Sequence, residues 1–175
     1  MKKLIFISLL FSILSLSVSA QKPTKAEKAA QLEQEFQQTR QLIESNHFQF
    51  ELNRVYPQDG QDLSRFNPRG KFVITDSVAK GTLPFFGRAY SLPYGEGGGI
   101  EFDGVMKDQS LKIEHKKKRK ILIYRFSITA KNDKRQISME ISGGGNCSVN
   151  LNSNNRAQIS YSGTVSPVKD ETGKS

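Results

Sequence analysis

Apolar residues recur along the chain with two different spacings, and the change between them falls near residue 47. Before that point they lie three, four or seven residues apart, a period that places them on one face of a helix. From Phe48 onward they alternate with polar residues, which is typical of strands that bury one face. The pattern therefore predicts one N-terminal helix followed by a long series of strands.

The helix is predicted over residues 24–46. Residues 25–46 contain no Gly or Pro and are rich in Ala, Glu, Gln and Leu, which favour helices. Thr24 and Glu27 have the spacing of a capping box. The apolar stripe consists of Ala29, Leu32, Phe36, Leu42 and Ile43. We expect this stripe to pack on the sheet. Binding to a membrane surface is the alternative, although the opposite face mixes Glu with Lys and Arg and has no cationic bias.

The remaining segments predict a sheet over residues 47–165. Strands are expected near residues 48–52, 72–75, 90–93, 100–102, 111–113, 121–128, 137–141, 149–151 and 157–161. The Gly-rich segments 95–99 and 143–145 are interpreted as hairpin turns, and Pro84 argues against a central strand around it. The fold class is α+β, with an N-terminal amphipathic helix packed on a largely antiparallel β-meander. A single domain is expected over residues 21–165, followed by a frayed polar tail at residues 166–175.

Residues 1–20 have the pattern of a secretory signal peptide. Lys2 and Lys3 precede an apolar stretch, and small residues end at Ala20. The apolar stretch is shorter than the ~20 residues that a spanning helix needs, although a retained N-terminal anchor is the alternative. Cleavage after Ala20 would lower the net charge from +9 to +7 and leave no transmembrane segment. The pattern therefore predicts that the protein is exported.

Composition limits what the chain can build. It has 175 residues, 36% of them hydrophobic, with one Cys and no Trp. These values suit one modest domain and exclude a disulfide scaffold and a multi-pass membrane protein. Cys147 cannot form an internal bridge, so we expect a small buried or turn residue. An intermolecular disulfide or a reactive thiol is the alternative.

Several short motifs together resemble a known family. They are Gly81-Thr-Leu-Pro-Phe-Phe-Gly-Arg-Ala89, Pro93-Tyr-Gly95, Gly98-Gly-Ile-Glu-Phe102, Asn155-Arg156 and Ile159-Ser-Tyr-Ser-Gly163. With the signal peptide, they resemble the secreted bacterial family catalogued as domain of unknown function 4251, over roughly residues 40–165. The resemblance implies export in a Gram-negative bacterium, to the periplasm or the exterior, and an α+β domain. It implies no activity and transfers no catalytic residue.

The sequence provides little for catalysis. His47 and His115 each lack a second metal ligand at a suitable spacing. Phosphate-binding loops and the Gly-x-Ser-x-Gly elbow are missing, so no catalytic residue, metal or cofactor is predicted. The carboxylates of Glu101, Asp103 and Asp108 could still converge in space. A small hydrolase therefore remains an alternative, as does a purely structural envelope protein.

Residues 115–120 form the strongest charge feature, with five of six residues basic. The candidate basic patch is Lys116, Lys117, Lys118, Arg119 and Lys120. We favour a solvated hairpin tip over a surface for anionic lipid, polysaccharide or nucleic acid, because no aromatic residues interleave the run. Nucleic acid is not expected as a partner.

The stretch from Leu83 to Tyr94 is the better candidate site. Its candidate residues are Phe85, Phe86, Arg88, Tyr90 and Tyr94. They are able to line a groove for an envelope protein or a glycan. For this loop by itself we favour a structural role, in which Phe86 plugs the end of the sheet and Arg88 pairs with an acid such as Glu101, because motifs with Gly and Pro often fix backbone shape. Ser77, in Asp-Ser-Val, also resembles a bacterial O-glycosylation acceptor. For the protein as a whole, we expect a binding module, and its oligomeric state is unknown.

Overall fold

The computed structural model describes residues 24–91, 98–116, 119–130 and 133–169. The predicted signal peptide lies outside these residues. The chain divides into two compact units, Met1–Gln31 and Leu32–Ser175, and the sheet belongs to the second. The described residues contain one long helix, α2 (Lys25–Glu44), and one 3₁₀ turn, η2 (Ser64–Phe66).

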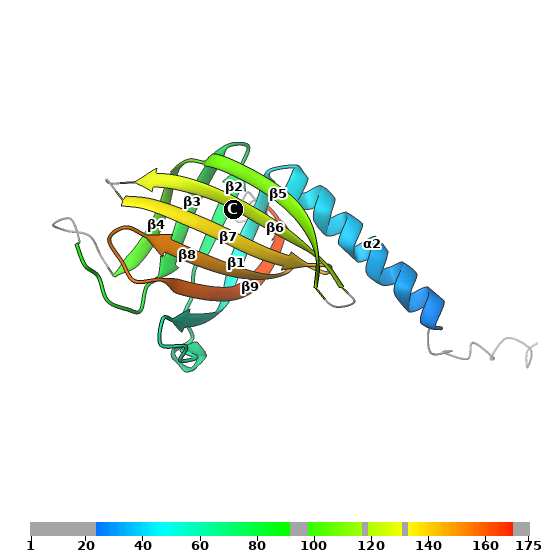
Figure 1. Cartoon of the computed structure of the whole chain (residues 1–175), viewed down its shortest axis with the longest axis horizontal. Coiled ribbons are helices and arrows are strands. Elements are labelled where there is room, and N and C mark those ends of the chain that lie inside the picture. Colours follow the sequence, from blue (N-terminus) through cyan, green and yellow to red (C-terminus); the bar gives the residue numbers. More distant parts are fainter. Residues whose placement is uncertain (1–23, 92–97, 117–118, 131–132, 170–175) are drawn as a thin grey trace, which may run out of the picture. The chain divides into compact units, whose positions relative to one another are not determined.

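Nine strands form a single sheet in the order β4-β3-β2-β1-β9-β8-β7-β6-β5, and every pairing is antiparallel. The strands are β1 (His47–Pro57), β2 (Lys71–Thr75), β3 (Val78–Pro84), β4 (Gly99–Val105), β5 (Lys107–Lys116), β6 (Arg119–Ala130), β7 (Asp133–Ser142), β8 (Asn146–Ser153) and β9 (Ile159–Pro167). The chain forms two meanders, β1–β4 and β5–β9, which are joined by the pairing of β1 with β9. Figure 1 shows that the sheet curls strongly.

The curl brings the two ends of the sheet order together. Strands β4 and β5 are consecutive in the chain, separated only by Met106. Strand β4 also lies against β6, where Gly104 approaches the carbonyl oxygen of Thr129. Strands β4 and β6 are not hydrogen-bonded neighbours in the order of the sheet. A seam without a β-ladder therefore runs between β4 and β6.

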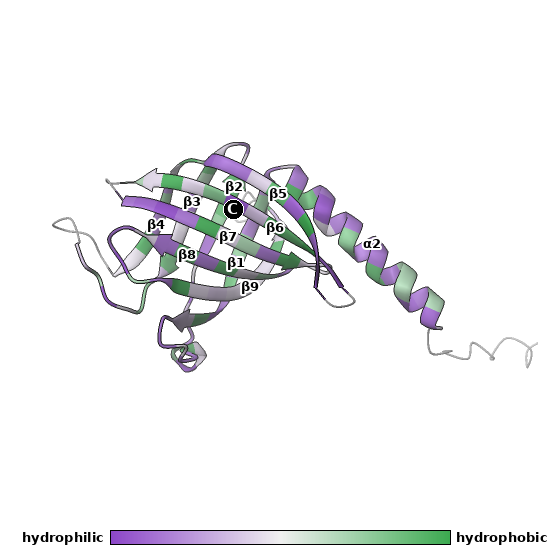
Figure 2. Cartoon of the chain, viewed as in Figure 1, coloured by the Kyte–Doolittle hydropathy of each residue, from purple (hydrophilic) through white to green (hydrophobic). Residues whose placement is uncertain are grey.

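The inner face of the curled sheet forms the core. On β6, Leu122, Tyr124, Phe126 and Ile128 are buried together, as the alternation predicts. Aromatic rings continue the core across the other half of the sheet: Phe72 lies 4.7 Å from Phe102 and 5.2 Å from Phe50, between ring centroids. Figure 2 shows the corresponding alternation of apolar and polar positions along the strands.

The sheet corrects three sequence predictions. The turn predicted at residues 95–99 implied a hairpin of residues 90–93 with residues 100–102, but β4 pairs instead with β3, where Leu83 lies opposite Ile100. Pro84 is tolerated because it is the last residue of β3. The Gly143–Gly145 hairpin turn between β7 and β8 is confirmed, whereas residues 92–97 lie outside the described residues. Strand β9 continues to Pro167, two residues into the segment predicted as a tail.

Helix α2 starts with the predicted capping box: the Thr24 amide donates to the Glu27 carboxylate at 2.7 Å, and the Glu27 amide donates to Thr24 Oγ1 at 3.2 Å. Phe36 and Ile43 are buried, but Leu32 on the same stripe is 55% exposed and Ala29 is exposed. Packing of the whole stripe on the sheet is therefore not confirmed. The fold is more β-rich than the predicted α+β class. No helix in the described part of the chain is long and apolar enough to cross a membrane.

Candidate functional site

The candidate loop, residues 85–91, follows β3 and is held by backbone contacts to the connection between β8 and β9. The amides of Tyr90 and Ser91 donate to the carbonyl oxygen of Asn155 at 2.8 and 3.3 Å. The Ala157 amide donates to the Arg88 carbonyl oxygen at 2.9 Å, and Ala89 forms a β-bridge with Arg156. Two segments that are about 70 residues apart in sequence are thus fixed against each other.

The first part of the loop faces the core. Phe85 and Phe86 are half-buried and pack against the core cluster. The guanidinium carbon of Arg156 lies 5.1 Å from the centroid of the Phe85 ring, within cation–π distance. Just before the loop, the Tyr161 hydroxyl donates to the Pro84 carbonyl oxygen at 2.9 Å. These contacts are those of a loop that covers the end of the core.

The second part of the loop faces solvent. Arg88 is exposed and the Tyr90 side chain is 66% exposed, although the backbone of both residues is held. Tyr94 lies outside the described residues. The structure therefore separates the predicted group into a packed pair, Phe85 and Phe86, and an exposed pair, Arg88 and Tyr90. A contact between Arg88 and Glu101 stays a prediction.

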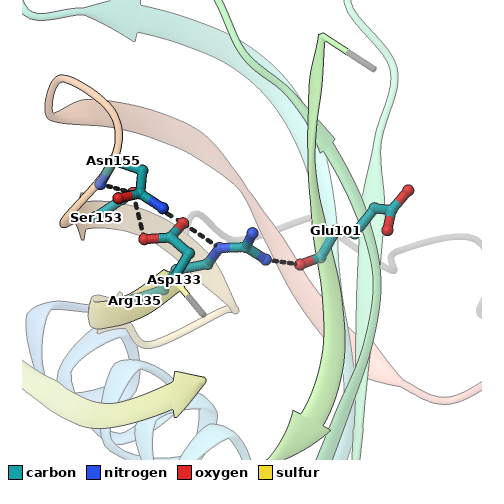
Figure 3. Close-up of polar contacts among 5 residues, drawn as sticks. All are labelled: Glu101, Asp133, Arg135, Ser153 and Asn155. Atoms are coloured by element: carbon teal, nitrogen blue, oxygen red, sulfur yellow. Dashed lines mark hydrogen bonds and ion pairs between the residues drawn. The ribbon is translucent and has the colours of Figure 1, made fainter. Parts of the chain in front are cut away.

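A buried polar network contacts Asn155, in the segment that holds the loop (Figure 3). Arg135 Nε donates to Asp133 at 2.8 Å, and both side chains are almost completely buried. The Ser153 hydroxyl donates to the Asp133 carboxylate at 2.9 Å and accepts a hydrogen bond from the Asn155 amide at 3.1 Å. Asn155 in turn accepts the hydrogen bond of the Tyr90 amide, so the network extends to the candidate loop.

Arg135 also reaches across the seam. Its Nη1 donates to the carbonyl oxygen of Glu101 on β4 (Figure 3). We did not predict this network from the sequence, although a signal was present. Asp133 and Arg135 continue the alternation of Ile137, Met139 and Ile141, and charged residues at core-facing positions need partners.

The basic run forms the tip of the β5–β6 hairpin, where Lys116 lies opposite Arg119. Lys116 Nζ lies 2.5 Å from the Glu140 carboxylate, and Lys120 Nζ lies 3.0 Å from that of Glu33. These pairs reduce the positive charge that the tip offers to an anionic surface. Lys117 and Lys118 lie outside the described residues. Binding of an anionic polymer stays a prediction.

Ser77 lies in the turn between β2 and β3. Its side chain is exposed, and its carbonyl oxygen accepts a hydrogen bond from the Met106 amide at 2.7 Å. The neighbouring Asp76 has a positive φ of 54°. Val73 and Val78 line a shallow hollow of about 500 Å³ beside Ser77. The serine is thus accessible, and its role as a glycan acceptor stays a prediction.

Asp108, one of the three candidate carboxylates, lines a hollow. It accepts a hydrogen bond from Ser127 at 2.8 Å, in a depression of about 320 Å³ that Arg125 also lines. Glu101 and Asp103 are exposed residues of β4. Among the described residues, no group of three or more His, Cys, Asp or Glu is placed to hold a metal ion.

Burial shifts the pKa of three acidic side chains that lie in the core. It raises the pKa of Tyr124 to about 12. It also raises the pKa of Tyr161 and of Cys147, and the charge of Glu140 adds to the shift at Cys147. Cys147 is free and buried, as the sequence predicts. Its thiolate is disfavoured, which argues against a reactive thiol.

Comparison with known proteins identifies relatives of unknown function. The family model described as "Domain of unknown function (DUF4251)" matches residues 30–165. A crystal structure of a DUF4251 family protein from Bacteroides eggerthii DSM 20697 has a TM-score of 0.55 at 22% sequence identity, over 79% of this chain and 91% of that one. This likeness shows the fold. No curated protein matches the sequence. Because the family model covers most of the sheet and the candidate loop, the chain belongs to the DUF4251 family.

Proposed function

We propose that this protein is an exported, periplasmic binding module that contacts an envelope protein or glycan through Arg88 and Tyr90 and catalyses no reaction. The observation that carries the proposal is the exposure of these two side chains on a loop whose backbone is fixed. Tyr and Arg are the side chains that most often dominate binding energy. Because the backbone is already ordered, a partner does not have to order it on binding.

A small hydrolase is the competing proposal, and it requires an acid or a histidine whose pKa is shifted towards neutrality. Within the described residues, the shifted carboxyl pKa values belong to Glu27, Glu33 and Asp62, and all three are lowered. The main cause of each lowered pKa is a hydrogen bond that the exposed carboxylate accepts. Such shifts favour the ionised form, whereas a general acid needs a raised pKa.

The test is capture of a partner from the organism's own envelope fraction by the purified protein, with mass spectrometry of the bound material. Arg88→Ala and Tyr90→Ala are expected to reduce capture by at least about tenfold. Arg65→Ala and Phe66→Ala are matched controls, because Phe66 is 59% exposed and Arg65 lies 4.8 Å from its ring centroid. Capture that is equally strong with the loop variants would overturn the proposal.

The same experiment separates the two kinds of partner. Protease treatment of the envelope fraction abolishes capture of a protein, whereas glycan-degrading enzymes abolish capture of a glycan. Export is tested separately by fractionating the cells and sequencing the N-terminus of the mature protein. Processing after Ala20, which leaves Gln21 first, is the expected result.

A further inference from the structure

Strand β5 is an open edge of the sheet. Among the described strands it pairs only with β6, and it is the terminal strand in the order of the sheet (Figure 1). Its ten residues are exposed or half-buried. The backbone N–H and C=O groups on its outer side are a template for a further strand.

A bulge limits the usable part of this edge. The β5–β6 register shifts between Lys107 and Ser110 and is regular from Ser110 to Lys116. Within the bulge, Asp108 has a positive φ of 54° and its side chain bonds Ser127. A second strand can therefore pair with seven residues, 110–116, whose centre is Ile113.

We propose that two copies of this chain form a symmetric dimer by antiparallel pairing of their β5 strands, with the two-fold axis at Ile113. Along an edge strand, alternate residues direct their backbone hydrogen-bonding groups outward. In a pair of identical antiparallel strands, odd-numbered residues therefore lie opposite odd-numbered residues, and even-numbered opposite even-numbered. The two-fold axis must then pass through one residue of each strand, which leaves few registers to compare.

The charges select one of these registers. With the axis at Ile113, Lys112 of each copy lies opposite Glu114 of the other, which gives two favourable pairs. An axis at Lys112 or at Glu114 places two like charges directly opposite each other. An axis at Leu111 shortens the regular overlap because of the bulge. Only the Ile113 register uses all seven residues and pairs opposite charges.

The apolar positions agree with this register. Leu111 and Ile113 lie opposite the buried Tyr124 and Leu122 of β6, so they belong to the core face of the sheet. Leu111 is half-buried, but Ile113 is 42% exposed at the open edge. In the dimer, the two Ile113 side chains lie opposite each other and continue the apolar face across the axis.

Sedimentation of the purified protein over roughly 1–500 µM tests the proposal. The expected result is a monomer–dimer equilibrium. Lys112→Glu and Glu114→Lys should each weaken it by at least about tenfold, because each change places two like-charged pairs in the interface. The double variant, in which the charges are exchanged, should restore it. Lys80→Glu, a charge reversal on the interior strand β3, is the control and should leave the equilibrium unchanged.

Ile113→Cys gives an independent readout. Because the axis passes through this residue, oxidation should link two copies through Cys at position 113. Lys80→Cys should remain unlinked under the same conditions. A wild-type monomer at every concentration, a charge-exchanged variant that fails to dimerise, or a failure of Ile113→Cys to link would each overturn the proposal. Circular dichroism of every variant confirms that the sheet has formed.

Discussion

The guanidinium of Arg135 occupies the seam where the sheet lacks a β-ladder. It donates to the Glu101 carbonyl oxygen on β4 and to the Asp133 carboxylate on its own strand, and it is 2% exposed. Removing two charges from water is costly, so such a pair persists only when its remaining hydrogen-bonding groups are satisfied. Ser153 supplies a further hydrogen bond to Asp133.

Replacing Arg135 with Met should therefore destabilise the protein strongly. The Asp133 carboxylate would lose its cation in a buried site, and the expected loss in the free energy of unfolding is about 3–5 kcal/mol. Urea unfolding measures it. The double variant Arg135→Met/Asp133→Leu should recover part of the loss because it leaves no unpaired buried charge. A single variant within about 0.5 kcal/mol of wild type would contradict this account.

Gly81 is required by backbone geometry at the pairing of β2 with β3. Its φ is +147°, and an added Cβ would lie 2.2 Å from the Lys71 carbonyl oxygen and 2.5 Å from the Phe72 Cα. Gly81→Ala should reduce the free energy of unfolding by at least about 2 kcal/mol. Gly98→Ala is the control, since nothing lies within 4 Å of its added Cβ, and it should be nearly neutral. Equal urea midpoints for the two variants would refute the argument.

At the scale of elements, local patterns predicted strands better than they predicted partners. The alternation over residues 121–128 correctly identified the buried face of β6, and the capping box correctly identified the start of α2. The predicted partner of β4 was wrong. Proximity in sequence favoured a hairpin between residues 90–93 and residues 100–102. The actual partner, β3, ends in Pro84, which local rules discount.

The candidate loop shows the same limit. Its aromatic residues and Arg88 were predicted as a group, but the contacts that separate them into packed and exposed pairs come from residues 155–157. These contacts, and the network of Asp133, Arg135 and Ser153, join segments that are distant in sequence. The alternation marks Asp133 and Arg135 as core-facing, but period and composition do not identify the distant segments that contact them.

The Ser153 hydroxyl is a positioning group for the loop. It holds the Asn155 amide, and the Asn155 carbonyl oxygen accepts the hydrogen bond of the Tyr90 amide. Ser153→Ala should therefore increase the hydrogen-exchange rate of the Tyr90 and Ser91 amides, with little change in the core of β6. Ser160→Ala is the control, because Ser160 donates to Asn150 at 2.7 Å, away from the loop. Equal exchange at Tyr90 in both variants would show that the hydroxyl does not order the loop.

For the molecule as a whole, folding removes several weak acids from water. Tyr124, Tyr161 and Cys147 are each at most 3% exposed, and burial raises the pKa of all three. In each case the folded state retains a proton that the unfolded state releases at lower pH. As the pH rises, these groups therefore ionise in the unfolded state before they ionise in the folded state. This stabilises the unfolded state, and the free energy of unfolding falls.

The order of these losses follows from the ordinary pKa values. An exposed thiol ionises near pH 8.5 and an exposed phenol near pH 10. As the pH rises, ionisation of Cys147 in the unfolded state should therefore lower the free energy of unfolding first, and ionisation of the two tyrosines should lower it next. Tyr124 continues to lower the free energy of unfolding until the pH reaches its pKa in the folded state, about 12. Urea midpoints measured under reducing conditions should thus be level near pH 7 and fall above about pH 8.5. Cys147→Ala should delay the fall to about pH 10, because only the tyrosines then remain to ionise. Parallel decreases of the wild type and Cys147→Ala between about pH 8 and 10 would show that the buried thiol is not linked to folding.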